Sequence, residues 1–241
     1  MADKMSSLRL AKKELRKSVR QTISSLSEES IKSQSRVVTS MILSLPEYQK
    51  AGSLGVYLSM PRGEISTGAI VKDALQLGKR VFVPYIYGKA VPREPEAPRS
   101  MMDMVSLHSL EDYETLAPDS WGIPTPSEPS LGGRNSCLNG AGYNDCDGKT
   151  KEEGNIELII MPGMAFDKAL GRLGHGKGYY DIFLRQFHEK SAPDGSRHHL
   201  PFLIGLALQE QMLPNDQRVP MDPTDWPVDA LAVGDGSLVR R

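Results

Sequence analysis

The feature that most constrains the fold of this 241-residue chain is a glycine-rich segment set between two apolar patterns. Residues 156–161 are apolar apart from Glu157 and end at a Pro-Gly pair, which is typical of a strand covered on both faces. Four glycines then fall within residues 171–178, and after them apolar residues recur at helical spacing as far as Phe187. This order of strand, loop and helix predicts an α/β fold with the glycines at the carboxyl end of a strand.

The loop has the composition of a phosphate-binding site. Closely spaced glycines let backbone N–H groups approach an anion, and the N-terminus of the helix that follows adds a partial positive charge. Arg172, His175 and Lys177 lie among these glycines. A surface loop without a ligand is the alternative, but such loops seldom combine clustered glycines with basic residues, paired tyrosines and an acid at a strand-to-helix junction.

Two standard phosphate motifs nearly fit, and both fail. Residues 171–177 match the start of a Walker A loop, but Gly178 follows where a magnesium-binding Ser or Thr is required. A dinucleotide-binding fingerprint that begins at Gly174 requires a third glycine where this chain has Tyr179. Asp181, one helical turn beyond the loop, is a candidate for the oxygen ligand to magnesium that the Walker motif lacks here.

The same segment resembles the signature of the 5-formyltetrahydrofolate cyclo-ligase family, which is close to PG-aliphatic-x-FD followed by RLGxGxGYYD. The resemblance implies a single three-layer α/β domain of Rossmann-like type around a mainly parallel sheet. It also implies an enzyme that uses ATP to convert 5-formyltetrahydrofolate into 5,10-methenyltetrahydrofolate, by phosphorylation of the formyl oxygen and ring closure, with release of ADP and phosphate. The matching residues are Pro162, Gly163, Phe166, Asp167, Arg172, Leu173, Gly174, Gly176, Gly178, Tyr179, Tyr180 and Asp181.

The resemblance continues near the N-terminus, where the family carries a K-x-x-L-R pattern whose cations reach the nucleotide phosphates. Lys12, Leu15 and Arg16 match it on a basic helix expected over residues 8–23, whose cations would otherwise be interpreted as a solvated face.

Magnesium is the implied cofactor, with Asp181 and Asp225 as candidate ligands. The implied ATP-binding residues are Lys12, Lys13, Arg16, Arg172, Gly174, Gly176, Lys177, Gly178 and Tyr180, of which Lys177 and Arg172 are also the expected catalytic residues.

The folate side of the site is expected after a strand at residues 53–58. There, Glu64 is either an ordinary acid near a helix N-terminus or, as the resemblance implies, the carboxylate that pairs with the amide-like edge of a pterin. Residues 101–105 are either an edge strand with core methionines or a wall of the ligand site. The implied substrate-binding residues are Leu58, Glu64, Trp121, His175 and Tyr179.

The rest of the chain alternates helices and strands within one domain that spans residues 1–241, with polar insertions near residues 91–100 and 127–154. The expected helices run from a capping box at Ser25 to Leu45 and from a cap at Thr67 to Gly78, and the expected strands cover residues 80–83, ended by Pro84, 101–105, 202–208 and 230–233.

Composition argues against several other classes of protein. The net charge of −1 gives no field that would attract nucleic acid, and no apolar stretch approaches the length of a membrane span. Cys137 and Cys146 share a polar loop without metal-ligand spacing, and the adjacent pair at residues 198–199 is poor metal geometry. We expect a monomeric, cytoplasmic protein whose partners are 5-formyltetrahydrofolate and ATP, while the basic N-terminus leaves a mitochondrial location open.

Three other functions compete with this interpretation. A kinase that uses the imperfect Walker-like loop is disfavoured by Gly178. A folate- or nucleotide-binding protein that has lost catalysis is disfavoured by the joint presence of Lys12, Arg16, Lys177 and Asp181. An interaction module in the long loops stays open as a second role.

Overall fold

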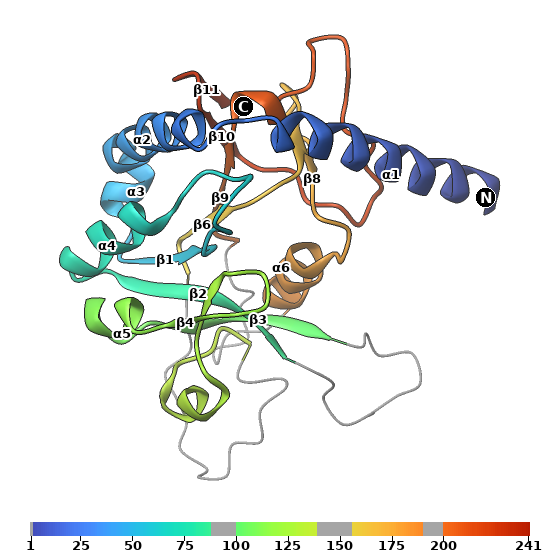
Figure 1. Cartoon of the computed structure of the whole chain (residues 1–241). Coiled ribbons are helices and arrows are strands. Elements are labelled where there is room, and N and C mark those ends of the chain that lie inside the picture. The colour runs from blue at the N-terminus through green and yellow to red at the C-terminus, as the bar shows by residue number, and fades with distance from the viewer. Residues whose placement is uncertain (1, 88–99, 139–155, 190–199) are drawn as a thin grey trace.

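The computed structural model describes residues 2–87, 100–138, 156–189 and 200–241, with side chains from Ser6 onward (Figure 1). Its helices are α1 Ala2–Ser24, α2 Glu28–Ser44, α3 Pro46–Lys50, α4 Gly68–Gln76, α5 Leu110–Glu114 and α6 Tyr179–Glu189, with 3-10 helices η1 Glu128–Gly133 and η2 Gln209–Gln211. Its strands are β1 Ser53–Val56, β2 Arg80–Tyr87, β3 Met101–Ser106, β4 Ala117–Pro118, β5 Pro124–Thr125, β6 Leu158–Met161, β7 Ala165–Phe166, β8 Arg172–Leu173, β9 Phe202–Ala207, β10 Ala230–Val233 and β11 Leu238–Arg240.

A seven-stranded sheet in the order β11-β10-β9-β6-β1-β2-β3 forms the centre of the molecule. The strands from β10 to β2 are parallel, and the two edge strands, β11 and β3, are antiparallel to their neighbours. The predictions of a mainly parallel sheet and of an edge strand at residues 101–105 are therefore confirmed.

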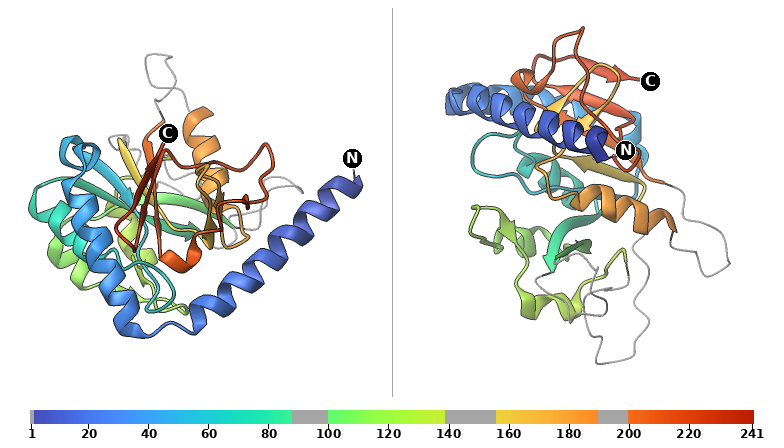
Figure 2. Two further views of the ribbon diagram at one scale, coloured as in Figure 1. Left: turned by 90° about the horizontal axis from the view of Figure 1, so that it is seen from above. Right: turned by 90° about the vertical axis from the view of Figure 1, so that its right-hand side faces the viewer.

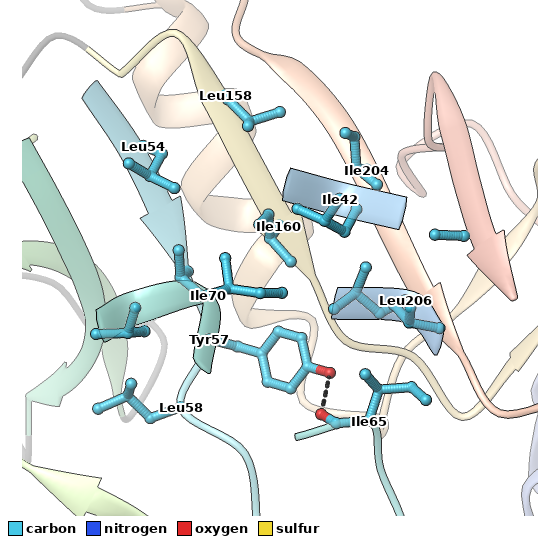
Figure 3. Close-up of a cluster of buried hydrophobic side chains, with 14 of the residues drawn as sticks. Ile42, Leu54, Tyr57, Leu58, Ile65, Ile70, Leu158, Ile160, Ile204 and Leu206 are labelled. Atoms are coloured by element: carbon cyan, nitrogen blue, oxygen red, sulfur yellow. Dashed lines mark hydrogen bonds between the residues drawn. The ribbon is translucent and has the colours of Figure 1, made fainter. Parts of the chain in front are cut away.

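Helices cover both faces of the sheet, with α2 and α4 on one side and α6 on the other (Figures 1 and 2). Side chains alternate along β6, so Leu158 and Ile160 join the first core cluster with Ile42 of α2 (Figure 3). Ile159 joins the second cluster with the apolar face of α6. This alternation explains why the sequence around β6 reads as a nearly continuous apolar run, and it confirms the three-layer α/β domain.

The strand order reverses between β1 and β6. The connection from β1 to β2 passes through α4 on one face, whereas the connection from β6 to β9 passes through α6 on the opposite face. The loops that leave the carboxyl ends of β1 and β6 consequently diverge. In open α/β sheets such a switch point is where ligands bind.

The segment between β6 and α6 is more ordered than the long loop expected from the sequence, because β7 and β8 pair as an antiparallel hairpin. Phe166 of β7 is fully buried between two glycines, Gly163 and Gly205. A Cβ atom would lie 2.5 Å from the Phe166 ring at Gly163 and 2.8 Å from it at Gly205. The ring therefore anchors the hairpin against the ends of β6 and β9.

Replacing Gly205 with alanine is expected to destabilise the protein by roughly 1–3 kcal/mol, since the added methyl overpacks this anchor. The Cβ would also lie 2.9 Å from a methyl carbon of Leu231, so the added methyl would clash with both Phe166 and Leu231. The free energy of unfolding, measured by denaturant titration, checks this. The matched control is Gly132→Ala, where a Cβ meets no described atom within 4 Å, and equal losses in both variants would contradict the anchor.

Several details of the expected elements were wrong. Helix α2 is capped by Ser27, whose side chain accepts the N–H of Ser30, so Ser25 is not the cap. Strand β2 does not end at Pro84 but continues beside β3. Strand β1 pairs with β2 only as far as Phe82, so no ladder hydrogen bond on the β1 side requires the N–H that Pro84 lacks. Strand β11 follows a turn at Gly236 and was missed altogether.

Thr67 lies at the N-cap of α4 but makes no capping hydrogen bond, because its hydroxyl donates to the carbonyl of Tyr57 at 2.6 Å instead.

The polar insertion expected from residue 127 is partly built into the fold. Cys137 is buried, and Arg134 makes two hydrogen bonds of 2.6 Å to the Asp112 carboxylate. Residues 139–155, including Cys146, and the predicted features at residues 91–99 and 198–199 lie outside the described residues.

Candidate active site

The glycine loop lies between β8 and α6 and contacts α1. Gly176 and Gly178 have φ angles of +107° and +68°, which residues with a Cβ rarely adopt. The Nε atom of Arg16 donates to the carbonyl of Gly174 at 2.8 Å, and a Cβ at Gly176 would lie 3.4 Å from the Arg16 guanidinium. Arg16 therefore supports the loop from α1, while Lys177 is exposed at its tip.

A buried carboxylate fixes the hairpin that carries this loop. Asp167 accepts the backbone N–H groups of Ala169, Gly171 and Val219 at 2.7–3.0 Å. Val219 belongs to the segment between β9 and β10, so Asp167 joins the hairpin to that segment. The acid of the FD pair in the motif is therefore needed for the structure, because without it these backbone N–H groups would lose their acceptor.

Arg172 is buried behind the loop, and its guanidinium donates to Oδ1 of Asp181 at 2.9 Å. The same oxygen accepts the backbone N–H of Trp226 at 3.0 Å. The guanidinium also lies 5.7 Å from the centre of the Tyr180 ring. Its Nε atom has no hydrogen-bond partner among the described residues, so this buried cation has one N–H donor available to a ligand.

Lys12 of α1 reaches the segment that follows Val219. Its ammonium lies 2.7 Å from Oδ2 of Asp222 and 2.5 Å from Oδ2 of Asp225. Burial alone would lower the pKa of Lys12, but its hydrogen bonds to the two acids leave that pKa raised. The Lys12 ammonium in turn holds the pKa of Asp222 well below its usual range. Lys13, by contrast, is exposed.

The two predicted magnesium ligands lie close together, because Asp181 accepts the N–H of the residue that follows Asp225. Each carboxylate uses one oxygen in the hydrogen bonds described above, so Oδ2 of Asp181 and Oδ1 of Asp225 remain outside them. Magnesium commonly takes one or two carboxylates and completes its shell with water and phosphate oxygens, so this donor set fits the ion. No group of three or more acidic, His or Cys side chains suited to a metal occurs within the described ranges.

Glu64 lies on the loop after β1 and is 9% exposed. Desolvation raises its pKa to about 7, and a hydrogen bond with the backbone of Met60 opposes part of that rise. The hydroxyl of Tyr57 donates to the carbonyl of Ile65 at 2.7 Å (Figure 3). Tyr57 thereby fixes the loop that places a carboxylate in an apolar setting. A buried acid with a displaced pKa on the loop after a switch-point strand is a candidate for ligand recognition.

The remaining predicted substrate residues are placed less uniformly. Leu58 is buried in the first core cluster. The hydroxyl of Tyr179 is 2.8 Å from Oγ of Ser100. Trp121 is 72% exposed, although its neighbour Gly122 packs on Pro61 of the Glu64 loop. The turn therefore lies beside the Glu64 loop, while the indole ring is exposed to solvent.

His175 is exposed on the glycine loop, yet nearby groups affect its ionisation. Desolvation lowers the pKa of His175, and the positive charges of Arg20, Arg172 and Arg16 lower it further. The ring is therefore neutral at neutral pH and does not add to the positive charge of the loop.

Sequence reasoning missed three contributors to this site. These are Tyr57, which fixes the Glu64 loop, Asp222, which binds Lys12, and Arg20, which acts on His175. Two signals were present: Asp222 is three residues before Asp225, and Arg20 continues the i, i+4 series that begins at Lys12. Tyr57 reads as an ordinary strand residue and carries no such signal.

The fold and the site together define a single-domain α/β protein that carries a cation-lined glycine loop and a buried carboxylate on the segments that follow the two strands of a topological switch point. The sequence model of the 5-formyltetrahydrofolate cyclo-ligase family matches residues 9–234. This chain belongs to that family.

Individual relatives agree with the family match. A probable 5-formyltetrahydrofolate cyclo-ligase of Schizosaccharomyces pombe is 34% identical over 222 residues, which cover 92% of this chain and 94% of the relative. The Mus musculus 5-formyltetrahydrofolate cyclo-ligase is 31% identical over 225 residues, with 93% and 94% covered. The solved structure of Aquifex aeolicus 5,10-methenyltetrahydrofolate synthetase has a TM-score of 0.60 and 26% identity, with 95% of this chain and 92% of that chain covered.

Proposed function

We propose that this chain catalyses the ATP-dependent conversion of 5-formyltetrahydrofolate into 5,10-methenyltetrahydrofolate. The observation that carries the proposal is the meeting, at one switch point, of the cation-lined glycine loop and the buried Glu64 in a chain of the cyclo-ligase family. The reaction needs a phosphate site and a site for a flat heterocycle side by side, and these two features supply them.

The chemistry explains why ATP is required. A formamide oxygen is a very poor leaving group, so the formyl oxygen first attacks the γ-phosphorus of ATP and ADP departs. The neighbouring amine of the folate then attacks the formyl carbon and loses its proton, and the oxygen leaves as phosphate while the ring closes. The enzyme mainly has to position the reacting atoms and stabilise the transferring phosphoryl group.

On the ATP side, the backbone N–H groups of Gly174, Gly176 and Gly178 bind phosphate oxygens. Lys177 and Arg172 are the catalytic cations that stabilise the phosphoryl group in transfer. Arg16 holds the loop in its binding conformation through the Gly174 carbonyl. Lys12 and Lys13 add positive charge from α1.

On the folate side, the Glu64 carboxylate accepts N–H groups of the heterocycle edge. Leu58 packs against the ring, and the exposed indole of Trp121, on the turn beside the Glu64 loop, is available to stack on it. Tyr179, at the start of α6, and the neutral His175 of the glycine loop contact the substrate.

Asp181 and Asp225 would hold magnesium through Oδ2 and Oδ1, the carboxylate oxygens that lie outside the hydrogen bonds described above. When bound, the ion neutralises charge on the phosphates during transfer. Within the chain, Arg172 orients Asp181 through their 2.9 Å hydrogen bond, and Lys12 orients Asp225.

A spectrophotometric assay tests the proposed reaction. Purified protein with 5-formyltetrahydrofolate, ATP and magnesium should produce the near-ultraviolet absorption band of the methenyl product. Omitting ATP, or removing magnesium with a chelator, should abolish the increase in absorbance. A flat trace from protein with a normal circular dichroism spectrum would refute the cyclo-ligase reaction, and calorimetric binding of folate or ATP would then identify a binding protein without turnover.

We propose a monomer in the cytoplasm whose partners are these two small molecules, with no role for nucleic acid. The net charge of −1 supports the expectation that nucleic acid is not a partner. None of the described helices combines the length and apolar character that crossing a bilayer requires. Gel filtration and fluorescence microscopy of the tagged protein check the oligomeric state and the location.

A further inference from the structure

Tyr180 in the first turn of α6 has a buried hydroxyl without a hydrogen-bond partner among the described residues. A buried hydroxyl that gives up water without gaining a partner costs free energy, and native proteins rarely leave one unpaired. Such a group points to a partner that binds later.

The surroundings of this hydroxyl indicate the partner. The Arg172 guanidinium covers the Tyr180 ring, and the ring packs against the core cluster that contains Tyr57 and Leu58. The hydroxyl lies within electrostatic range of the Glu64 carboxylate, as does the hydroxyl of Tyr57. The Tyr57 hydroxyl is occupied by the Ile65 carbonyl, so it is not available to a ligand.

Tyr180 and Glu64 are therefore near enough to interact electrostatically, but the Tyr180 hydroxyl does not hydrogen-bond the carboxylate in the described structure. A carboxylate only accepts hydrogen bonds, whereas a tyrosine hydroxyl both donates and accepts them. A pterin edge presents N–H donors beside a carbonyl and ring-nitrogen acceptors. The combination of Glu64 and Tyr180 can satisfy both kinds of group on one flat ring.

We propose that the Tyr180 hydroxyl hydrogen-bonds the heterocyclic head of the folate substrate beside Glu64, and so determines specificity for the folate and not for ATP. This rests on the proposed cyclo-ligase reaction and changes one expectation from the family resemblance, which places Tyr180 with the nucleotide. The preceding Tyr179 cannot share this role, because consecutive helix residues point about 100° apart. Its hydroxyl also has Ser100 as a partner.

The test is Tyr180→Phe, which removes only the hydroxyl. We expect KM for 5-formyltetrahydrofolate to rise about tenfold, in line with one lost hydrogen bond in a desolvated site, while KM for ATP stays unchanged. The midpoint temperature of unfolding should not fall, since the removed hydroxyl has no partner in the free protein. A residue with a merely structural role would give the opposite pattern, with lower stability and no selective change in KM.

Tyr57→Phe is the matched control, because it removes a buried hydroxyl that does have a partner and should lower the unfolding temperature. An unchanged KM for the folate in Tyr180→Phe, or a rise confined to ATP, would overturn the proposal. Calorimetric binding of 5-formyltetrahydrofolate without ATP separates the two proposals. Failure of the wild-type protein to turn over the folate refutes the reaction, whereas equal folate affinity in wild type and Tyr180→Phe refutes only the role of Tyr180.

Discussion

Replacing Glu64 with glutamine should make the protein more stable and a much poorer enzyme. An ionised carboxylate that accepts two N–H groups binds the heterocycle far better than an amide, which presents a donor to donors. Hydrogen bonds to charged groups contribute roughly 1.5–3 kcal/mol each, so kcat/KM should fall by about two orders of magnitude. KM for ATP should change little, because the proposed role of Glu64 is to bind the folate heterocycle and not the nucleotide.

The stability change follows from the raised pKa of Glu64, which is about 7 against a usual 4.5. At pH values between 4.5 and about 7, Glu64 keeps its proton in the native state but has released it in the unfolded state. The binding of this proton therefore stabilises the native state fully below pH 4.5, and the stabilisation is lost as pH rises through about 7. The shift corresponds to roughly 3 kcal/mol, which the ionised Glu64 costs the fold at pH 8. The glutamine variant avoids that cost.

Denaturant titrations at pH 5 and pH 8 measure this effect. The advantage of Glu64→Gln over wild type should be larger at pH 8, and the wild-type kcat/KM should fall below about pH 7 as Glu64 takes up its proton. Glu111→Gln, an exposed acid of α5, serves as the control and should alter neither property. A glutamine variant that is less stable at pH 8, with normal kcat/KM, would remove Glu64 from the site.

Replacing Lys177 with alanine should lower kcat by roughly 10²–10³, the usual result of removing a group that stabilises charge in the transition state. Lys177 is exposed between two glycines with positive φ angles, and its side chain takes part in no hydrogen bond or ion pair with a described residue. The lysine is therefore available to a phosphate, and its removal should leave the free energy of unfolding within about 0.5 kcal/mol of wild type.

Single-turnover kinetics with saturating ATP measure this loss separately from binding. Lys177→Arg should recover part of the rate, because the charge remains while the position of the donor changes. Lys168→Ala, an exposed lysine in the turn of the same hairpin, is the matched control and should keep the wild-type rate. Comparable rates in Lys177→Ala and Lys168→Ala would show that the loop lysine does not act on the phosphoryl group.

Local patterns were enough to predict the elements that depend on local physics. The apolar run of β6, the amphipathic α6 and the glycines between them were all recognisable, because burial on two faces and positive φ angles leave direct marks on composition. The motif then identified the family. Even the antiparallel edge strand β3 could be located from its methionine-rich run.

The remaining features depend on contacts between distant parts of the chain. The fit of Phe166 between Gly163 and Gly205 depends on the register of β6 beside β9, and no local pattern encodes that register. The partners of Lys12 are more than 200 positions away. The Trp121 indole, which the motif places near the ligand, points to solvent, because side-chain direction at a turn depends on packing that the sequence does not reveal.

The ion pair between Lys12 and Asp222 spans 210 positions, so two segments far apart in the sequence meet at the candidate site. During synthesis on the ribosome, β1, β2 and β6 emerge and can pair long before Asp222 exists. Until then, Lys12 has no acid to hold it, and α1 is not fixed through Lys12. The core of the sheet can thus form early, whereas the phosphate site is completed only after Asp222 has been synthesised.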